Sequence, residues 1–158
     1  MSEDTKIAID IWQAPSRPSR SQFPAEFAEK LTKREKHPLG DLFGLTVFGV
    51  NLTKITPGGQ SAVRHAHSVN DEFIYVVKGE ATLVTDAGET PMNEGMCTGF
   101  KAGNGDAHHL VNKTDEDVYY LEIGDRLPND EVIYPDDDLA VKKADGKRTF
   151  FHKDGTPY

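Results

Sequence analysis

Two histidines and one glutamate stand near the middle of the chain at a spacing suited to the ligands of a metal ion. His65 and His67 are separated by one residue, and Glu72 follows five positions later. Since alternate residues of a β-strand point to the same face, both imidazoles would project from one side of an extended segment. A further histidine, His108, lies downstream. The pattern predicts a site for one divalent transition metal per chain, held by these four side chains. The ligand types do not discriminate among Fe, Mn, Ni, Zn and Co.

Short strands must position these ligands. Glu72 begins the run 72–77, and the polar connection 68–71 is short enough for an antiparallel return that would place Glu72 beside the histidines. His108 belongs to a later predicted strand, 107–112, and shares one face of it with Leu110 and Asn112. The residues that share a face with the ligands, and that we expect to line the pocket, are Ile74, Val76, Leu110 and Asn112. Because most of them are apolar, the pocket would hold a small organic ligand rather than a polymer.

The segment around the first three ligands resembles a known family. It reads Gly59-x5-His65-x-His67-x4-Glu72-x6-Gly79, which matches the first motif of the cupin superfamily at every fixed position and spacing. The resemblance implies a double-stranded β-helix, or jelly-roll barrel, with a metal at its centre. It also implies a homodimer.

The second motif of that family is matched less closely. The stretch Gly105-x2-His108-x3-Asn112 fits, but Gly103 stands where the family usually has proline. Seven residues instead of five separate Gly95 from Gly103, which loosens the turn before His108. The neighbouring His109 falls on the opposite face of its strand and is not expected to be a ligand.

The rest of the chain supports an all-β fold. Runs of strand-forming residues over 42–56, 72–77, 80–85, 107–112 and 117–123 are separated by glycine-containing or polar turns, which is typical of a barrel or sandwich. Lys78-Gly79 predicts a tight hairpin between two of these runs. We expect one domain, 1–158, with its barrel core at about 42–124.

Extensions flank the predicted barrel on both sides. The N-terminal arm, 1–41, is expected to contain a strand at 6–12, where isoleucine alternates, and a short helix at 24–35 beginning with Pro24. The C-terminal extension, 125–158, is expected to contain short strands at 131–134 and 148–151.

Three functions remain open at this point. The metal could serve isomerisation of a sugar or sugar phosphate, or dioxygenation. Alternatively the protein could bind a small ligand without turnover, with a metal that anchors the ligand or stabilises the barrel. A phosphorylated substrate would need basic groups, for which Arg64, Lys101 and Arg126 are available. A proton-transfer step would need a second group near the metal. The candidates are Tyr75, Tyr119, Tyr120, Glu122 and His109, and the sequence does not choose among them.

Composition excludes several classes of partner. The chain has 18 Lys and Arg against 26 Asp and Glu, so its net charge of −8 disfavours nucleic acids and anionic lipid surfaces. The single cysteine, Cys97, excludes an intramolecular disulfide framework. No apolar run approaches the ~18–20 residues of a membrane span, and the N-terminus does not resemble a secretory signal. A cytoplasmic location is therefore expected.

Overall fold

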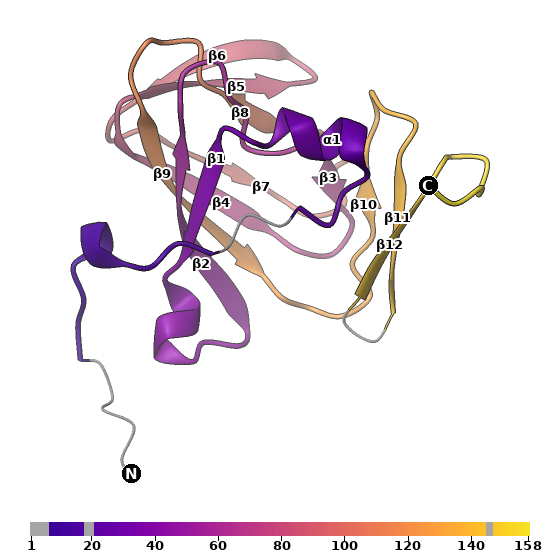
Figure 1. Ribbon diagram of the computed structural model, residues 1–158, viewed down its shortest axis with the longest axis horizontal. Coiled ribbons are helices and arrows are strands. Elements are labelled where there is room, and N and C mark those ends of the chain that lie inside the picture. Colours follow the sequence, from indigo (N-terminus) through magenta and orange to yellow (C-terminus); the bar gives the residue numbers. More distant parts are fainter. Residues whose placement is uncertain (1–6, 18–20, 145–146) are drawn as a thin grey trace.

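A five-stranded antiparallel sheet forms the largest layer of the computed structural model, which describes residues 7–17, 21–144 and 147–158 (Figure 1). Its strands, in spatial order, are β1 (Arg34–Pro38), β2 (Phe48–Ile55), β9 (Val118–Asp125), β4 (Glu72–Lys78) and β7 (Cys97–Phe100). The central pairing of β2 with β9 is in register over eight residues, from Phe48 opposite Asp125 to Ile55 opposite Val118.

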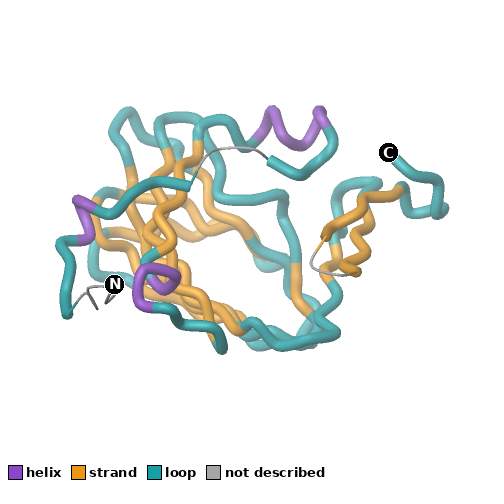
Figure 2. Tube along the Cα trace, turned by 60° about the horizontal axis from the view of Figure 1, so that its bottom comes forward, coloured by secondary structure: helices purple, strands orange, loops and turns teal. Residues whose placement is uncertain are grey.

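Two smaller sheets face or flank this layer. One has the order β6 (Gly88–Asn93), β5 (Glu80–Thr85) and β8 (His109–Val111). The other has the order β12 (Lys147–Phe151), β11 (Ala140–Ala144), β10 (Val132–Ile133) and β3 (Ala66–His67). The last three strands of the chain stand to one side of the barrel (Figures 1 and 2). The helical elements are η1 (Ile11–Gln13), α1 (Ala25–Lys30) and η2 (Gly40–Phe43). No helix of the described residues is both long enough and apolar enough to cross a membrane.

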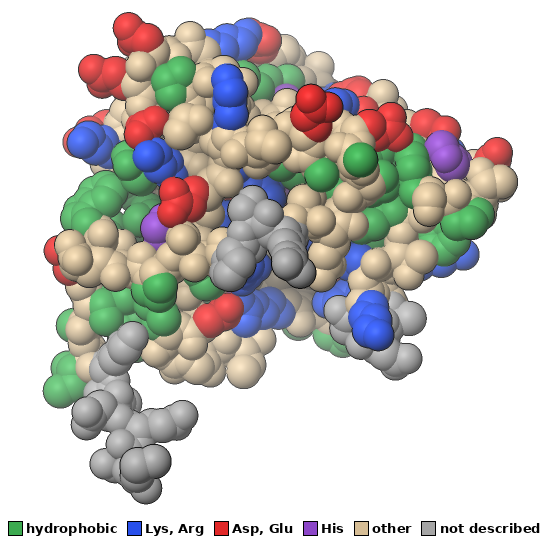
Figure 3. Space-filling view, in the orientation of Figure 1, with side chains coloured by type: hydrophobic (Ala, Val, Ile, Leu, Met, Phe, Trp, Pro, Cys, Tyr) green, Lys and Arg blue, Asp and Glu red, His purple; other side chains and the backbone are tan. Residues whose placement is uncertain are grey.

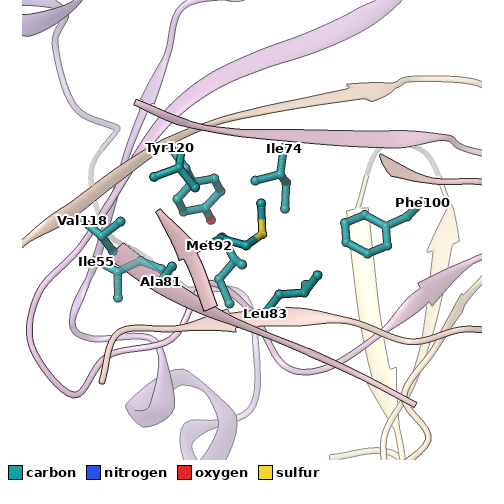
Figure 4. Close-up of a cluster of buried hydrophobic side chains, with 10 residues drawn as sticks. Ile55, Ile74, Ala81, Leu83, Met92, Phe100, Val118 and Tyr120 are labelled. Carbon is teal, nitrogen blue, oxygen red and sulfur yellow. The ribbon is translucent and has the colours of Figure 1, made fainter. Parts of the chain in front are cut away.

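The main hydrophobic core fills the space between the large sheet and the β6-β5-β8 sheet. Ile74 and Tyr120 from the large sheet meet Leu83 and Met92 from the opposing one (Figure 4). Burial of such side chains stabilises the fold by roughly 1.5–3 kcal/mol each. The alternation that predicted an all-β fold therefore reflects two sheet faces that pack against each other, and the prediction of fold class is confirmed.

The N-terminal arm differs from its prediction. No strand forms over the described part of 6–12; instead Ile11–Gln13 make one 3-10 turn, capped by the Asp10 side chain, which accepts a hydrogen bond from the Trp12 backbone N–H. Ile9 and Ile11 nevertheless pack on a second cluster around Leu52. The alternation of isoleucine in this segment therefore reflects burial of Ile9 and Ile11 against the barrel and does not indicate strand pairing.

The predicted helix 24–35 is also shorter than expected. It begins as predicted after Pro24 but ends at Lys30, because residues 34–38 form strand β1. All five residues of β1 pair with β2. Backbone pairing with a sheet outweighs the helix propensity of this segment, since a helix of this length is marginal by itself.

The expected hairpin at Lys78-Gly79 is wrong. Strands β4 and β5 belong to different sheets, so the chain crosses from one layer to the other at this point. Gly79 has φ +85°, and a Cβ placed on it would lie 2.8 Å from the Asp117 carbonyl oxygen. Glycine-containing turns do form at 86–89, in the β5–β6 hairpin, and at 93–95.

The C-terminal extension is built onto the barrel by strand pairing. Val132 and Ile133 of β10 pair with His67 and Ala66 of β3. The strand expected at 148–151 is present as β12, whereas β11 was not predicted. A cluster that includes Phe27 of α1, Tyr134 and Phe150 packs the extension against the N-terminal helix.

Candidate metal centre

Neighbouring strands bring the four predicted ligands to one place. His67 ends β3. His65 lies just before β3 and forms an isolated backbone bridge with His108, which lies just before β8. Glu72 is the first residue of β4 and pairs with Phe100 of β7. Parity of the strands thus directs all four side chains to the inner face, as the spacing predicted.

Three imidazoles converge on the Glu72 carboxylate. Its Oε2 lies 3.7 Å from His65 Nε2 and 2.9 Å from His108 Nε2, and its Oε1 lies 3.6 Å from His67 Nε2. One ligand atom from each of His65, His67 and Glu72 falls within 4.8 Å of the others. These separations suit side chains that share one metal ion.

Hydrogen bonds to the far side of two rings fix which nitrogen faces the carboxylate. His65 Nδ1 lies 2.8 Å from the Val63 carbonyl oxygen, and His67 Nδ1 lies 2.5 Å from Asp130 Oδ2. Since a carbonyl or carboxylate oxygen accepts, Nδ1 carries the proton in each ring, which leaves Nε2 as an electron-pair donor. The ring of His108 is held differently, stacked on Phe100 with centroids 3.4 Å apart.

Asp130 is a functional residue that the sequence did not reveal. Besides His67, its carboxylate accepts hydrogen bonds from the backbone N–H groups of Val69 and Asn70. Burial raises the pKa of Asp130, but these donors outweigh it and hold the pKa below its usual value. No motif marks Asp130, because it lies in a segment that reaches the site only through the pairing of β10 with β3.

The protonation states of His65 and Glu72 favour the binding of a metal cation. Burial lowers the pKa of His65 from 6.5 to about 4, although the Glu72 carboxylate opposes that shift, so the ring is neutral at neutral pH. Burial raises the pKa of Glu72, but the facing imidazoles outweigh it and bring that pKa to about 2. An ionised carboxylate beside neutral imidazole is the state in which these groups bind metals.

The surroundings of one buried atom, Glu72 Oε2, indicate whether a metal ion is compatible with the site. Glu72 Oε2 is buried and accepts no hydrogen bond from the described residues, although His108 Nε2 lies only 2.9 Å from it. A buried anionic oxygen without a partner is costly unless a cation compensates it. The donor set and this orphaned oxygen together fit a divalent transition metal.

The residues predicted to line the pocket lie elsewhere. Ile74, Val76 and Leu110 belong to the main hydrophobic core, and Asn112 is fully buried, where it donates to the carbonyl oxygens of Ile55 and Glu116. They share the ligands' face but sit further along their strands, where the two sheets close on each other. A small pocket at the site is lined by three of the candidate ligands, His67, Glu72 and His108. Its other lining residues include Ala66, Asn70, Phe100, Lys101, Asn104 and Asp106.

The structure also sorts the candidates for proton transfer. Tyr75 is 40% exposed on the outer face, Tyr119 packs edge-on against Trp12, and His109 Nδ1 faces the Ala62 carbonyl oxygen. Tyr120 is fully buried. Only Glu122, of the five, presents a partly accessible side chain on the inner face, where its Cα pairs with that of Ile74.

Comparison with known proteins adds family information. The model of the family described as "Cupin domain" matches residues 51–124. A crystal structure of a sugar phosphate isomerase of the cupin superfamily from Silicibacter pomeroyi is 38% identical, covers 96% of each chain and has a TM-score of 0.89. A putative sugar phosphate isomerase from Acidithiobacillus ferrooxidans is 26% identical over 86% of this chain and 94% of its own, with a TM-score of 0.72.

A more distant structure shares the fold alone. The polyketide cyclase RemF from Streptomyces resistomycificus is 17% identical, covers 78% of this chain and 82% of its own, and has a TM-score of 0.62. No curated protein matches the sequence significantly.

Proposed function

Because the chain belongs to the cupin superfamily, we propose that it binds one divalent transition metal and catalyses the isomerisation of a sugar phosphate. The convergence of three imidazole nitrogens on the Glu72 carboxylate carries the metal assignment. The substrate class rests on the two structures described as sugar phosphate isomerases. The ligand set by itself would suit dioxygenation or simple ligand binding equally well.

The residues of the site have two roles in this proposal: some would bind the metal, and others orient the metal-binding side chains. His65, His67, Glu72 and His108 would hold the ion, which would supply Lewis acidity toward a carbonyl or hydroxyl oxygen. Asp130 and the Val63 carbonyl oxygen keep two rings turned with Nε2 toward the site. Four protein ligands would leave positions open for substrate on a six-coordinate ion.

Interconversion of an aldose and a ketose also requires a group that moves a proton between adjacent carbons. We assign this role to Glu122. Burial raises the pKa of Glu122, but the ammonium of Lys36, 2.6 Å from its Oε1, outweighs that effect and holds the pKa below its usual value. The carboxylate is therefore ionised at neutral pH and can accept a proton.

The proposal is tested by metal analysis followed by an activity screen. Protein purified without chelators or a histidine tag should carry about one transition metal per chain, in keeping with a single four-ligand site. The metal-loaded protein should interconvert at least one aldose phosphate and ketose phosphate pair, detected by NMR, and leave the unphosphorylated sugars unchanged. Glu122→Gln should bind metal normally and lose turnover.

Two results would contradict the proposal in different ways. Protein that takes up no metal after incubation with Fe, Mn, Ni, Co and Zn has no such site. Protein that binds metal yet converts none of the sugar phosphates is a binding module or an enzyme of another class.

A further inference from the structure

A second polar cluster lies on the inner face of the five-stranded sheet, next to the hydrophobic core. Lys36 of β1 is paired with Glu122 of β9, whose Oε1 also accepts a hydrogen bond from Asn51 Nδ2 at 3.3 Å. The Tyr120 hydroxyl donates to Glu122 Oε2 at 3.4 Å. Arg34, two residues before Lys36 on the same face, donates to the Ser61 carbonyl oxygen. We call Arg34, Lys36, Asn51, Tyr120 and Glu122 the inner-face cluster.

Strand register places this cluster beside the metal centre. Glu122 is directly opposite Ile74 of β4, and Glu72 lies two residues from Ile74 on the same face. Such diagonal neighbours on adjacent antiparallel strands are about 7–8 Å apart. This separation is comparable to the length of one small sugar phosphate.

The charge of the cluster favours an anion. It holds two cations, Arg34 and Lys36, and one carboxylate, so its net charge is positive within an acidic chain. The side chains of Lys36 and Glu122 remain 22% and 21% accessible to solvent although they face the barrel interior. The outer surface shown in Figure 3 carries both acidic and basic side chains.

Two buried polar atoms near the cluster without hydrogen-bond partners also suggest that a polar ligand binds there. Asn51 Oδ1 and Thr53 Oγ1 are buried without a hydrogen-bond partner among the described residues, and Thr53 is 0% exposed on the face that carries Lys36 and Tyr120. Since buried polar atoms are almost always paired, a bound polar group is expected here. A hydroxyl at Thr53 can donate to a phosphate or sugar oxygen.

The other basic residues near the site are less suited to a phosphate. Arg64 is held by two carboxylates, Asp86 and Asp136, and Arg126 by Asp41. Lys36 is also paired, with Glu122, but Arg34 forms no ion pair with the described residues. Lys101 lines the outer mouth of the metal pocket, but Asp71, Asp106 and Asp125 line the same mouth and its adjoining groove. The mouth is therefore acidic and would repel a phosphate dianion.

We infer that Arg34 and Lys36, the two cations of the inner-face cluster, form a subsite for the phosphate group of the substrate, whereas Glu122 of the same cluster keeps its role in proton transfer. This deepens the proposed isomerase function and rests on it for the substrate class. The guanidinium and ammonium groups would donate charge-assisted hydrogen bonds to phosphate oxygens, while the sugar end of the molecule reaches the metal.

Equilibrium binding of inorganic phosphate and of fructose 6-phosphate to metal-loaded protein tests the subsite without requiring turnover. Arg34→Met and Lys36→Met should each weaken binding about tenfold or more, because each removes a charged donor. Lys54→Met is the matched control. Lys54 lies on β2, faces the outside and pairs with Asp117, so its removal should leave the dissociation constant unchanged.

Metal content and thermal unfolding report whether each variant is folded. Crystals of the unaltered protein soaked in phosphate or tungstate give a second measurement that needs no variant. Density for the anion is expected within hydrogen-bonding distance of Arg34 and Lys36. Density confined to the metal or to Lys101, absence of phosphate binding, or equal binding by the Met variants would overturn the subsite.

The two proposals fail separately. Phosphate binding that depends on Arg34 and Lys36, without conversion of any sugar phosphate, keeps the subsite and removes the isomerase assignment. Isomerase activity whose KM for the sugar phosphate is unchanged in Arg34→Met and Lys36→Met keeps the activity and removes the subsite.

Discussion

The imidazole of His67 owes its orientation to a carboxylate 63 positions away in the sequence. Asp130 accepts from its Nδ1 and so directs Nε2 toward Glu72, while the Val63 carbonyl oxygen does the same for His65. Such partners of metal-binding histidines fix the tautomer and raise the basicity of the ligand. At the scale of single residues, the site therefore depends on more than its four ligands.

Asp130→Asn should lower metal affinity by about 10–100-fold, because the amide is a weaker acceptor and can hold the ring in the wrong tautomer. Competition with a chelator of known affinity measures the change. Asp138→Asn is the control, since Asp138 makes a similar contact with His152 at 2.8 Å on the surface. Equal affinities for the two variants would show that Asp130 does not orient a ligand.

Replacing His65 and His67 together with alanine should abolish metal uptake and leave most of the β-structure intact, as followed by circular dichroism. Glu72→Gln should weaken uptake less severely, because it removes the negative charge and keeps an oxygen in place. If Glu72→Gln binds metal as tightly as the unaltered protein, another carboxylate coordinates the ion.

Stability of the metal-free protein should fall as the pH falls from about 6.5 to about 4. The pKa of His65 is 6.5 in ordinary surroundings and about 4 in the fold, so across this range the unfolded chain binds the proton and the folded chain does not. The penalty from His65 reaches about 3 kcal/mol at the lower end. Glu72, whose pKa falls from 4.5 to about 2, extends the loss below that pH.

Urea unfolding at a series of pH values in the presence of a chelator measures this dependence. His65→Gln removes the titrating group, so its stability should decline less between pH 6.5 and 4. An unchanged slope in that variant would mean that other groups cause the pH dependence.

At the scale of elements, the alternation of apolar residues in the sequence correctly predicts those strands that have one buried face. Glu72–Lys78 alternates buried and exposed side chains, and its bounds were predicted almost to the residue. The arm before the barrel alternates too, yet Ile9 and Ile11 pack on a cluster around Leu52 without joining a sheet. Local periodicity reports which side chains are buried, and the partner that buries them decides whether a strand forms.

Gly79 joins the two layers, and its substitution is expected to destabilise the fold. Gly79→Ala would place Cβ 2.8 Å from the Asp117 carbonyl oxygen in a backbone with φ +85°, at a cost of about 1–3 kcal/mol. Gly95→Ala is a matched control with φ +86° and no atom within 4 Å of its Cβ. Thermal unfolding should show a larger loss for Gly79→Ala, and equal losses would mean that the contact with Asp117 relaxes freely.

At the scale of the whole molecule, the extension after the barrel contributes to the site as well as to the fold. Strand β10 pairs with β3, which carries His67, and the segment before β10 supplies Asp130. Tyr134, which follows β10, lies with its ring centroid 6.3 Å from that of His65. The candidate metal centre is therefore enclosed by chain segments from both the barrel and its extension.

We expect the protein to form a homodimer. Phe73 and Tyr75 are both 40% exposed on the outer face of the large sheet, close to Phe48, which is 39% exposed. Apolar side chains grouped on one face suit contact with a second copy. Light scattering coupled to gel filtration should give twice the chain mass, and Phe73→Asp should shift the protein toward monomer. A monomeric unaltered protein would contradict this expectation.

The sequence by itself determined the all-β class, the register of the inner and outer faces and the identity of the four candidate ligands, because a strand's period of two links spacing to direction. Only the tertiary structure decided which residues surround them. Asp130, Phe100 and the inner-face cluster reach the site through pairing between distant strands, which leaves no local pattern. For the same reason Ile74, Val76 and Leu110 share the correct face yet lie in the core, since depth along a barrel depends on how the sheets close.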